Sequence, residues 1–177
     1  MEPTQSRESP AWLGLARGVQ AGVIGGVVML GFEMLASIFR GRVWWESANI
    51  LGSTFYGVRA FHTRAGMATV AGAALHLVIT GSIGLGFAAA LGSRLSRRWL
   101  MIAGIAAGIG WFYLGDALFW QRVNPLVPLY EPEPATLFAW ALMGMCLGGI
   151  TLAREPAATQ VLESEPASAN GLENAVE

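Results

Sequence analysis

Four long apolar runs constrain this chain more than any other feature of its sequence. They cover residues 19–39, 67–92, 100–121 and 135–153, and a helix needs about 20 apolar residues to cross a bilayer. Only 13% of the residues are charged, whereas soluble domains average roughly 25%. Buried helices of a soluble protein are the alternative, but four such runs in 177 residues argue against it. The sequence therefore predicts an all-α integral membrane bundle of four transmembrane helices.

The remaining segments divide the chain into three parts. Residues 1–16 are expected to form a polar N-terminal segment and residues 17–153 the transmembrane domain. Residues 154–177 are rich in Ala, Pro, Ser and Glu, a composition that predicts a disordered acidic tail. The first apolar run is longer than the core of a signal peptide, which is about 7 to 15 residues, and no small-x-small cleavage site follows it. We therefore expect an uncleaved first span.

The loop between the first two runs, residues 40–66, predicts a short helix lying in the membrane interface. It opens with Trp44 and Trp45, a residue type suited to the headgroup level. An amphipathic stretch follows, with apolar residues at helical spacing and polar residues on other sides. The apolar positions are Ala48, Leu51, Phe55 and Val58, and the polar positions are Asn49, Ser53 and Arg59. A plain polar loop is the alternative.

Arginine placement predicts the orientation, because short cytoplasmic loops carry an excess of basic residues. The link between the second and third runs holds Arg94, Arg97 and Arg98, which marks it as cytoplasmic. With four spans, both termini would then be cytoplasmic too. The first loop opposes this assignment with four arginines, which are Arg40, Arg42, Arg59 and Arg64.

Small residues four positions apart recur on all four runs. Such spacing lets helix backbones approach closely in lipid. The series are Gly18, Gly22 and Gly26; Ala68, Gly72, His76, Thr80, Gly84 and Ala88; Gly104 and Gly108; and Gly144 and Gly148. This GxxxG-type pattern predicts tight packing, and it indicates nothing about activity.

A resemblance to a family rests on several short motifs. The second run contains Gly72-Ala73-Ala74-Leu75-His76-Leu77 and Gly84-Leu85-Gly86-Phe87-Ala88, and Trp111, Asn124-Pro125-Leu126 and the glycine-ended fourth run (Gly144, Leu147, Gly148) follow. Over residues 18–153 the chain resembles small four-span bacterial inner-membrane proteins of the YagU-like, domain-of-unknown-function kind. The resemblance implies a four-helix fold and the bacterial inner membrane, and it implies no reaction. The chain departs from the pattern at Trp140, where such proteins often carry a histidine.

Three ionisable residues lie inside the apolar runs, where charge is costly. They are Glu33, His76 and Asp116. At a rise of about 1.5 Å per residue, all three would lie in the outer half of the bilayer. Glu33 would share a helix face with Gly22 and Gly26, and His76 would lie in its own small-residue series. Together with Thr80 and Tyr113 they form a predicted intramembrane polar cluster, which is either a proton- or ion-binding site or a set of structurally satisfied residues.

These observations leave two classes of function. The first is a non-enzymatic accessory or structural membrane subunit, and the alternative is a small proton- or ion-coupled transporter or channel using Glu33, His76 and Asp116. No catalytic, nucleotide or metal motif is present, so no enzyme activity, cofactor or metal is expected. The net charge of −1 gives no reason to expect nucleic acid. The expected partners are the lipid bilayer and either a membrane-protein complex or further copies of the chain.

Overall fold

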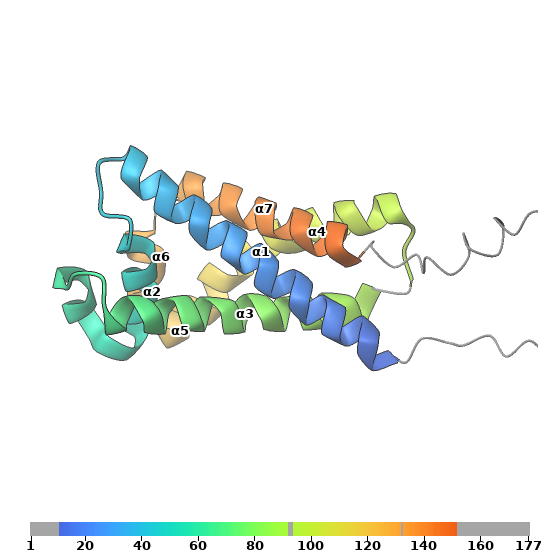
Figure 1. The fold of residues 1–177 in the computed structure, drawn as a ribbon, viewed down its shortest axis with the longest axis horizontal. Coiled ribbons are helices and arrows are strands. Elements are labelled where there is room, and N and C mark those ends of the chain that lie inside the picture. The colour runs from blue at the N-terminus through green and yellow to red at the C-terminus, as the bar shows by residue number, and fades with distance from the viewer. Residues whose placement is uncertain (1–10, 92–93, 132, 152–177) are drawn as a thin grey trace, which may run out of the picture.

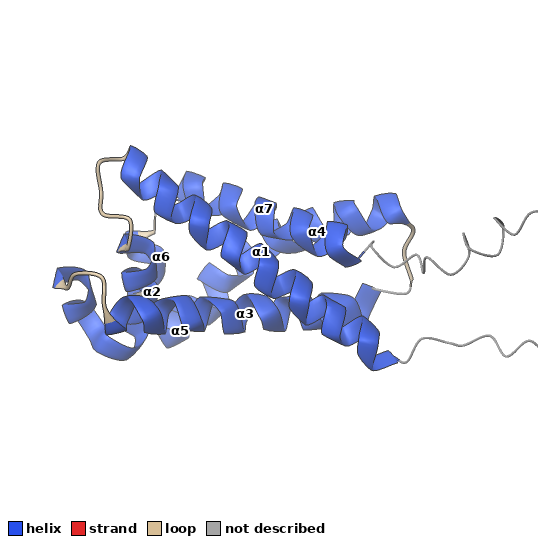
Figure 2. Cartoon of the chain, viewed as in Figure 1, coloured by secondary structure: helices blue, strands red, loops and turns tan. Residues whose placement is uncertain are grey.

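The computed structural model describes residues 11–91, 94–131 and 133–151, and within these ranges it contains helices and no strands (Figure 2). Three helical segments are long and apolar enough to cross a membrane: Trp12–Phe39, Met67–Leu91 and Arg97–Val123. A shorter apolar helix covers Pro134–Ile150. The all-α prediction is therefore confirmed, together with three of the helices that can span a bilayer. The predicted acidic tail lies outside the described residues.

The long helices follow the predicted runs with shifted ends. Helix α1 covers Ala11–Phe39, α3 Met67–Leu91, α4 Arg97–Leu114 and α7 Glu133–Thr151. α1 begins upstream of the expected start at residue 19, so the end of the predicted polar segment is helical. After α4 the chain continues through a π-helical turn, η2 (Gly115–Trp120), and the short helix α5 (Gln121–Val123).

Shorter elements gather at one end of the bundle. They are α2 (Glu46–Tyr56), the 3-10 helix η1 (Gly57–His62) and α6 (Leu126–Tyr130). Figure 1 shows α2 and α6 at this end, and the start of α1 and the end of α7 at the other. We call the end that holds α2, η1 and α6 the capped end. α1 packs against α3 and α7, α4 packs against α7, and α2 packs against α3.

Glycines bring the helix backbones into direct contact. A Cβ atom on Gly22 of α1 would overlap the carbonyl oxygen of Thr80 on α3. In the same way, a Cβ atom on Gly104 of α4 would overlap the carbonyl oxygen of Gly144 on α7. The small-residue series of α3 is divided between two neighbours, because Gly72 contacts α2 through the carbonyl oxygen of Ala48, whereas Gly84 contacts α1. These glycine contacts thus hold the helices at backbone contact distance.

The helix α2 forms in the loop where the sequence predicted a helix, and residues from both sides of the predicted amphipathic pattern are buried in the protein. Asn49 and Ser53, expected on the polar side, are 3% and 4% exposed. On the apolar side, Ala48 and Leu51 are buried as well, whereas Phe55 and Val58 are 61% and 60% exposed. α2 therefore packs on α3 with polar as well as apolar side chains buried.

Hydrogen bonds explain why these polar side chains can be buried. Asn49 donates from Nδ2 to the carbonyl oxygen of Ala60 (2.9 Å) and accepts from the hydroxyl of Thr69 (2.6 Å). Asn124, in the turn after α5, donates to the hydroxyl of Ser53 (2.7 Å). A buried polar group costs little once its partners are within the protein. These bonds fix α2 to η1, to α3 and to the turn that precedes α6.

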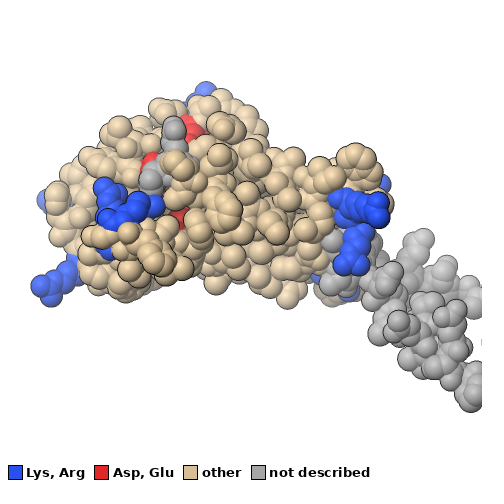
Figure 3. Space-filling view, turned by 90° about the horizontal axis from the view of Figure 1, so that it is seen from above, with Lys and Arg blue, Asp and Glu red and all other residues tan. Residues whose placement is uncertain are grey.

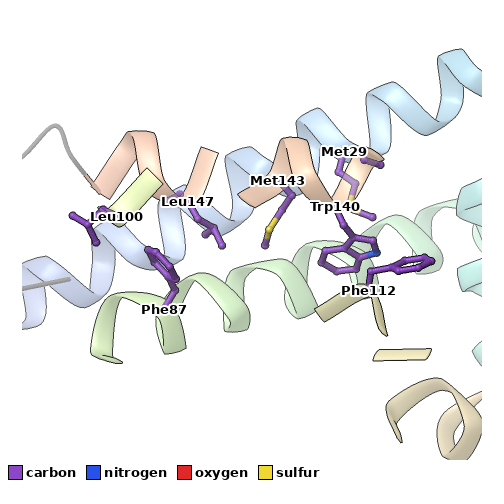
Figure 4. Packing of buried hydrophobic residues seen from close by; sticks show 9 residues of the cluster. Met29, Phe87, Leu100, Phe112, Trp140, Met143 and Leu147 are labelled. Carbon is purple, nitrogen blue, oxygen red and sulfur yellow. The ribbon is translucent and has the colours of Figure 1, made fainter. Parts of the chain in front are cut away.

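The interior of the bundle is filled by apolar side chains from α1, α3, α4 and α7. Figure 4 shows this cluster, with Met143 and Leu147 of α7 fully buried at its centre. Many large apolar side chains are instead exposed along the long helices, among them Val27, Val78, Ile102 and Phe138. In Figure 3, arginines lie at the two ends and a wide uncharged band separates them. Such a band is the surface that a lipid-facing bundle presents.

Candidate functional site

Glu33 is buried in α1 without a hydrogen-bond partner. Its side chain is 3% exposed, and both carboxyl oxygens are buried and unpaired within the described residues. Most buried polar side chains in proteins have a partner, so an orphaned carboxyl calls for a functional or structural explanation. The sequence predicted this residue as a member of the polar cluster.

His76 is buried in α3, and its ring is tied to the backbone of α1. Nε2 lies 3.0 Å from the carbonyl oxygen of Gly26, and because a carbonyl can only accept, Nε2 carries the proton. Thr80 is also satisfied locally, since its hydroxyl donates to the carbonyl oxygen of His76 at 3.0 Å. Nε2 of His76 therefore does not bond Glu33, whose two carboxyl oxygens have no hydrogen-bond partner among the described residues.

A small internal cavity nevertheless joins Glu33 and His76. Its other lining residues come from five elements of the chain and are Met29, Leu51, Ile79, Trp120, Glu131 and Trp140. The space open to the centre of a water molecule is about 10 Å³, roughly what one water needs. Met29 and Trp140 lie close together at this part of the core (Figure 4). The cavity holds about one water-sized particle and no larger solute.

Glu131 is the member of this site that the sequence did not reveal. It follows α6, outside the predicted spans, in the acidic and proline-rich stretch Glu131-Pro132-Glu133-Pro134. The acidity of this stretch was the only signal that the sequence offered for Glu131. Burial raises the pKa of Glu131 well above its usual range, and the neighbouring carboxyl groups of Glu33 and Asp116 raise that pKa further.

The turn before Glu131 explains how an acidic residue enters the protein here. Pro125 ends the preceding helix, since a proline disfavours helix at the residue before it, and Asn124 is bonded to Ser53 and Thr54 of α2. α6 then places Val127 at 0% exposure. The backbone nitrogen of Glu131 donates to the carbonyl oxygen of Val127 at 3.0 Å. α6 therefore directs the chain inward, and Glu131 reaches the cavity from the capped end.

Asp116 and Tyr113 lie in a different place from Glu33, His76 and Thr80. They line an open groove of about 520 Å³, together with Phe112, Ala117, Gln121, Pro134 and Leu137. Asp116 belongs to the π-helical turn η2, and Tyr113 is 60% exposed. Of the five residues predicted from the sequence, Glu33 and His76 thus line a closed cavity, Asp116 and Tyr113 line an open groove, and Thr80 lines neither.

The chemistry available at the cavity is that of carboxyl groups and one imidazole. Among the described residues, no group of three or more His, Cys, Asp or Glu side chains is arranged to hold a metal ion. Two carboxyl groups on a cavity of this size suit the binding of a proton. Comparison with protein-family models, curated proteins and solved structures finds no match to this chain. The resemblance inferred from the motifs therefore stays an expectation.

Proposed function

We propose that this chain is a four-pass protein of the bacterial inner membrane with both termini in the cytoplasm. The fourth pass would be α7, whose apolar part of 17 residues, Pro134–Ile150, extends about 26 Å at 1.5 Å per residue. That length is at the lower limit for a spanning helix. Support for the orientation comes from Arg94, Arg97 and Arg98, which are all exposed in the region that joins α3 to α4. The capped end would then face outward.

Within that setting, we propose a non-enzymatic, proton-coupled membrane protein, of the small transporter or channel class. The observation that carries this proposal is Glu33, whose two unpaired carboxyl oxygens are buried beside a cavity shared with His76 and Glu131. A buried carboxylate without partners is costly, and binding a proton removes its charge. Ionisable residues inside a membrane often belong to proton relays.

The size of the cavity narrows the species that this site can handle. A space of about 10 Å³ leaves room for about one water molecule. The interior around it is closed by side chains of α1, α2, α3 and α7, including Leu51 and Trp140. A proton fits such a site, whereas an organic solute does not. Any larger substrate would require a different conformation or a different surface of the protein.

Proton binding can be tested on the purified full chain in detergent. Difference infrared spectra between high and low pH report the carbonyl stretch of protonated carboxyl groups. We expect the wild type to show an infrared band of a buried, protonated carboxyl group whose intensity changes with pH. This band should be absent from Glu33→Gln. The control is Glu46→Gln, because Glu46 also has a buried oxygen without a partner, Oε2, but its Oε1 pairs with Arg42 (2.9 Å) and the residue does not line the cavity. A spectrum in which Glu33→Gln changes nothing would contradict the proposal.

The second candidate is an accessory or structural subunit of a membrane complex. The backbone contacts at Gly22, Gly72 and Gly104 favour it, because they make a tightly closed bundle. In that case Glu33→Gln should change the thermal stability of the protein or the set of proteins that co-purify with it. Proton uptake by proteoliposomes should then equal that of empty vesicles for both the wild type and the variant. Proton uptake that depends on Glu33 would instead support the coupled transporter or channel.

A further inference from the structure

The elements η2 and α7 each line both the closed cavity and the open groove. On η2, Asp116 lines the groove and Trp120 lines the cavity. On α7, Leu137 lines the groove and Trp140 lines the cavity. Each pair is three or four residues apart and so lies on one face of its helix, which makes the two compartments neighbours about one helical turn apart.

The π-helical geometry of η2 contributes to this arrangement. A π turn widens the helix by one residue and changes the direction of the side chains that follow it, and such turns are frequent at functional sites. η2 covers Gly115–Trp120. Within these six residues it presents a carboxyl group to the groove and a buried indole, 6% exposed, to the cavity.

Glu131 lies at the junction of the two compartments. It lines the cavity with Glu33 and is close enough to Asp116 for the two carboxyl groups to interact electrostatically. It also stands three residues before Pro134, which lines the groove. Its half-buried side chain is neither sealed inside, as Glu33 is, nor free on the surface.

We propose that Glu131 carries protons between the groove at Asp116 and the cavity at Glu33, so that the buried site exchanges protons with the capped end of the bundle. This inference rests on the proposed proton-binding role of Glu33. Glu131 does not belong to the polar cluster predicted from the sequence, and it gives Glu33 a path for protons to one side of the bundle.

The transfer balances with the groups already present. A protonated Glu131 gives its O–H proton to the carboxylate of Glu33, directly or across a space that fits one water. Glu131 is then a carboxylate and takes a new proton from hydronium in the groove. The reverse sequence releases the proton to the same side.

Three other ionisable groups act on this route, and one of them is Arg40, whose positive charge acts on the carboxyl group of Glu33. His76 lines the cavity and keeps its Nε2 proton in the hydrogen bond to Gly26. Asp116 supplies negative charge at the groove and favours protonation of Glu131. The faces contributed by α2 and α7 are apolar or aromatic, with Leu51 and Trp140 at the cavity.

The rate of proton exchange tests the route through Glu131, whereas the equilibrium response to pH tests proton binding at Glu33. Trp120 and Trp140 line the cavity, so their fluorescence can report protonation there after a rapid pH jump on the full chain in detergent. In Glu131→Gln we expect the slow, equilibrium change to persist and its rate to fall by tenfold or more. In Asp116→Asn the midpoint should move to lower pH, because a neighbouring negative charge is lost. Glu46→Gln should match the wild type.

Three outcomes would be decisive. An exchange rate in Glu131→Gln equal to that of the wild type would overturn the route while leaving proton binding at Glu33 intact. If the tryptophan fluorescence of the wild type does not change with pH at equilibrium, the proposed proton site itself is overturned. If Glu131→Gln does not fold, Glu131→Asp replaces it. A shorter carboxyl should slow exchange less than tenfold, and an unchanged rate in that variant would again count against the route.

Discussion

At the scale of single residues, the cavity places two carboxyl groups in one apolar environment. Glu33 reaches it from the last third of α1, and Glu131 reaches it from the turn after α6. Like charges at close range disfavour ionisation of both groups, so one proton bound at the pair is more favourable than two free carboxylates. Each carboxyl therefore depends on the protonation state of the other.

The raised pKa of Glu131 predicts a pH-dependent stability. A folded-state pKa above the unfolded value means that the folded protein holds the proton more tightly. Stability is then greatest below the ordinary glutamate pKa of about 4.3 and falls as pH rises toward the folded-state pKa. Glu131→Gln removes this contribution, so its melting temperature relative to the wild type should increase with pH. Thermal unfolding in detergent across pH checks this, and a constant difference would contradict it.

The coupling between the two carboxyl groups can be measured with a double-mutant cycle. Glu33→Gln removes a charge that acts on Glu131, so the second substitution, Glu131→Gln, should have a different effect in that background. We expect a coupling free energy of about 0.5–3 kcal/mol in thermal unfolding at neutral pH, the range for residues in contact. The same cycle with Glu33→Gln and Glu46→Gln should be additive. Additivity in both cycles would show that Glu131 does not interact with Glu33.

At the scale of helices, the bundle depends on positions where no side chain fits. Gly104 on α4 and Gly144 on α7 contact each other through their backbones. Gly110, also on α4, has nothing within 4 Å of the place where a Cβ atom would lie. The two glycines of α4 therefore have the same chemistry and opposite environments.

This contrast predicts the outcome of two alanine substitutions in α4. Gly104→Ala inserts a methyl group into the backbone contact with α7 and forces the helices apart. We expect a loss of about 1–3 kcal/mol, typical of overpacking. Gly110→Ala should be neutral. The measurement is thermal unfolding of both variants in the same detergent. Equal stability of the two variants would mean that α4 and α7 are not in backbone contact at Gly104.

At the scale of the whole molecule, the two ends differ in structure although both carry arginines (Figure 3). One end is covered by α2, η1 and α6, with Asn49 and Asn124 bonded inside. The other end holds the region between α3 and α4, where Arg94, Arg97 and Arg98 are exposed. The proton route proposed above would connect the buried site to the covered end.

Cysteine labelling in intact cells tests which end faces outward. The native Cys146 is first replaced by alanine, because it is the only cysteine of the chain. Val58→Cys, at an exposed position of η1, should then react with an impermeant thiol reagent. Ser96→Cys, at an exposed position just before α4, should react only after the membrane is permeabilised. The opposite pattern would reverse the topology and the side of proton uptake.

The sequence by itself was sufficient for the features that depend on local composition. Burial in lipid is a sum over consecutive residues, so the apolar runs predicted the long helices that the structure contains. A charged residue within such a run is costly wherever its helix lies, so Glu33 and His76 could be singled out, and both prove to be buried.

Only the tertiary structure decided which distant segments meet. Ser53 and Asn124 are 71 residues apart and share a hydrogen bond, and bonds of this kind allow polar residues of α2 to be buried beside its apolar ones. The same turn carries Glu131 to Glu33, while η2 turns Asp116 to the separate groove. Hydrophobic periodicity describes one element at a time, whereas the burial of a polar residue depends on partners that other elements supply.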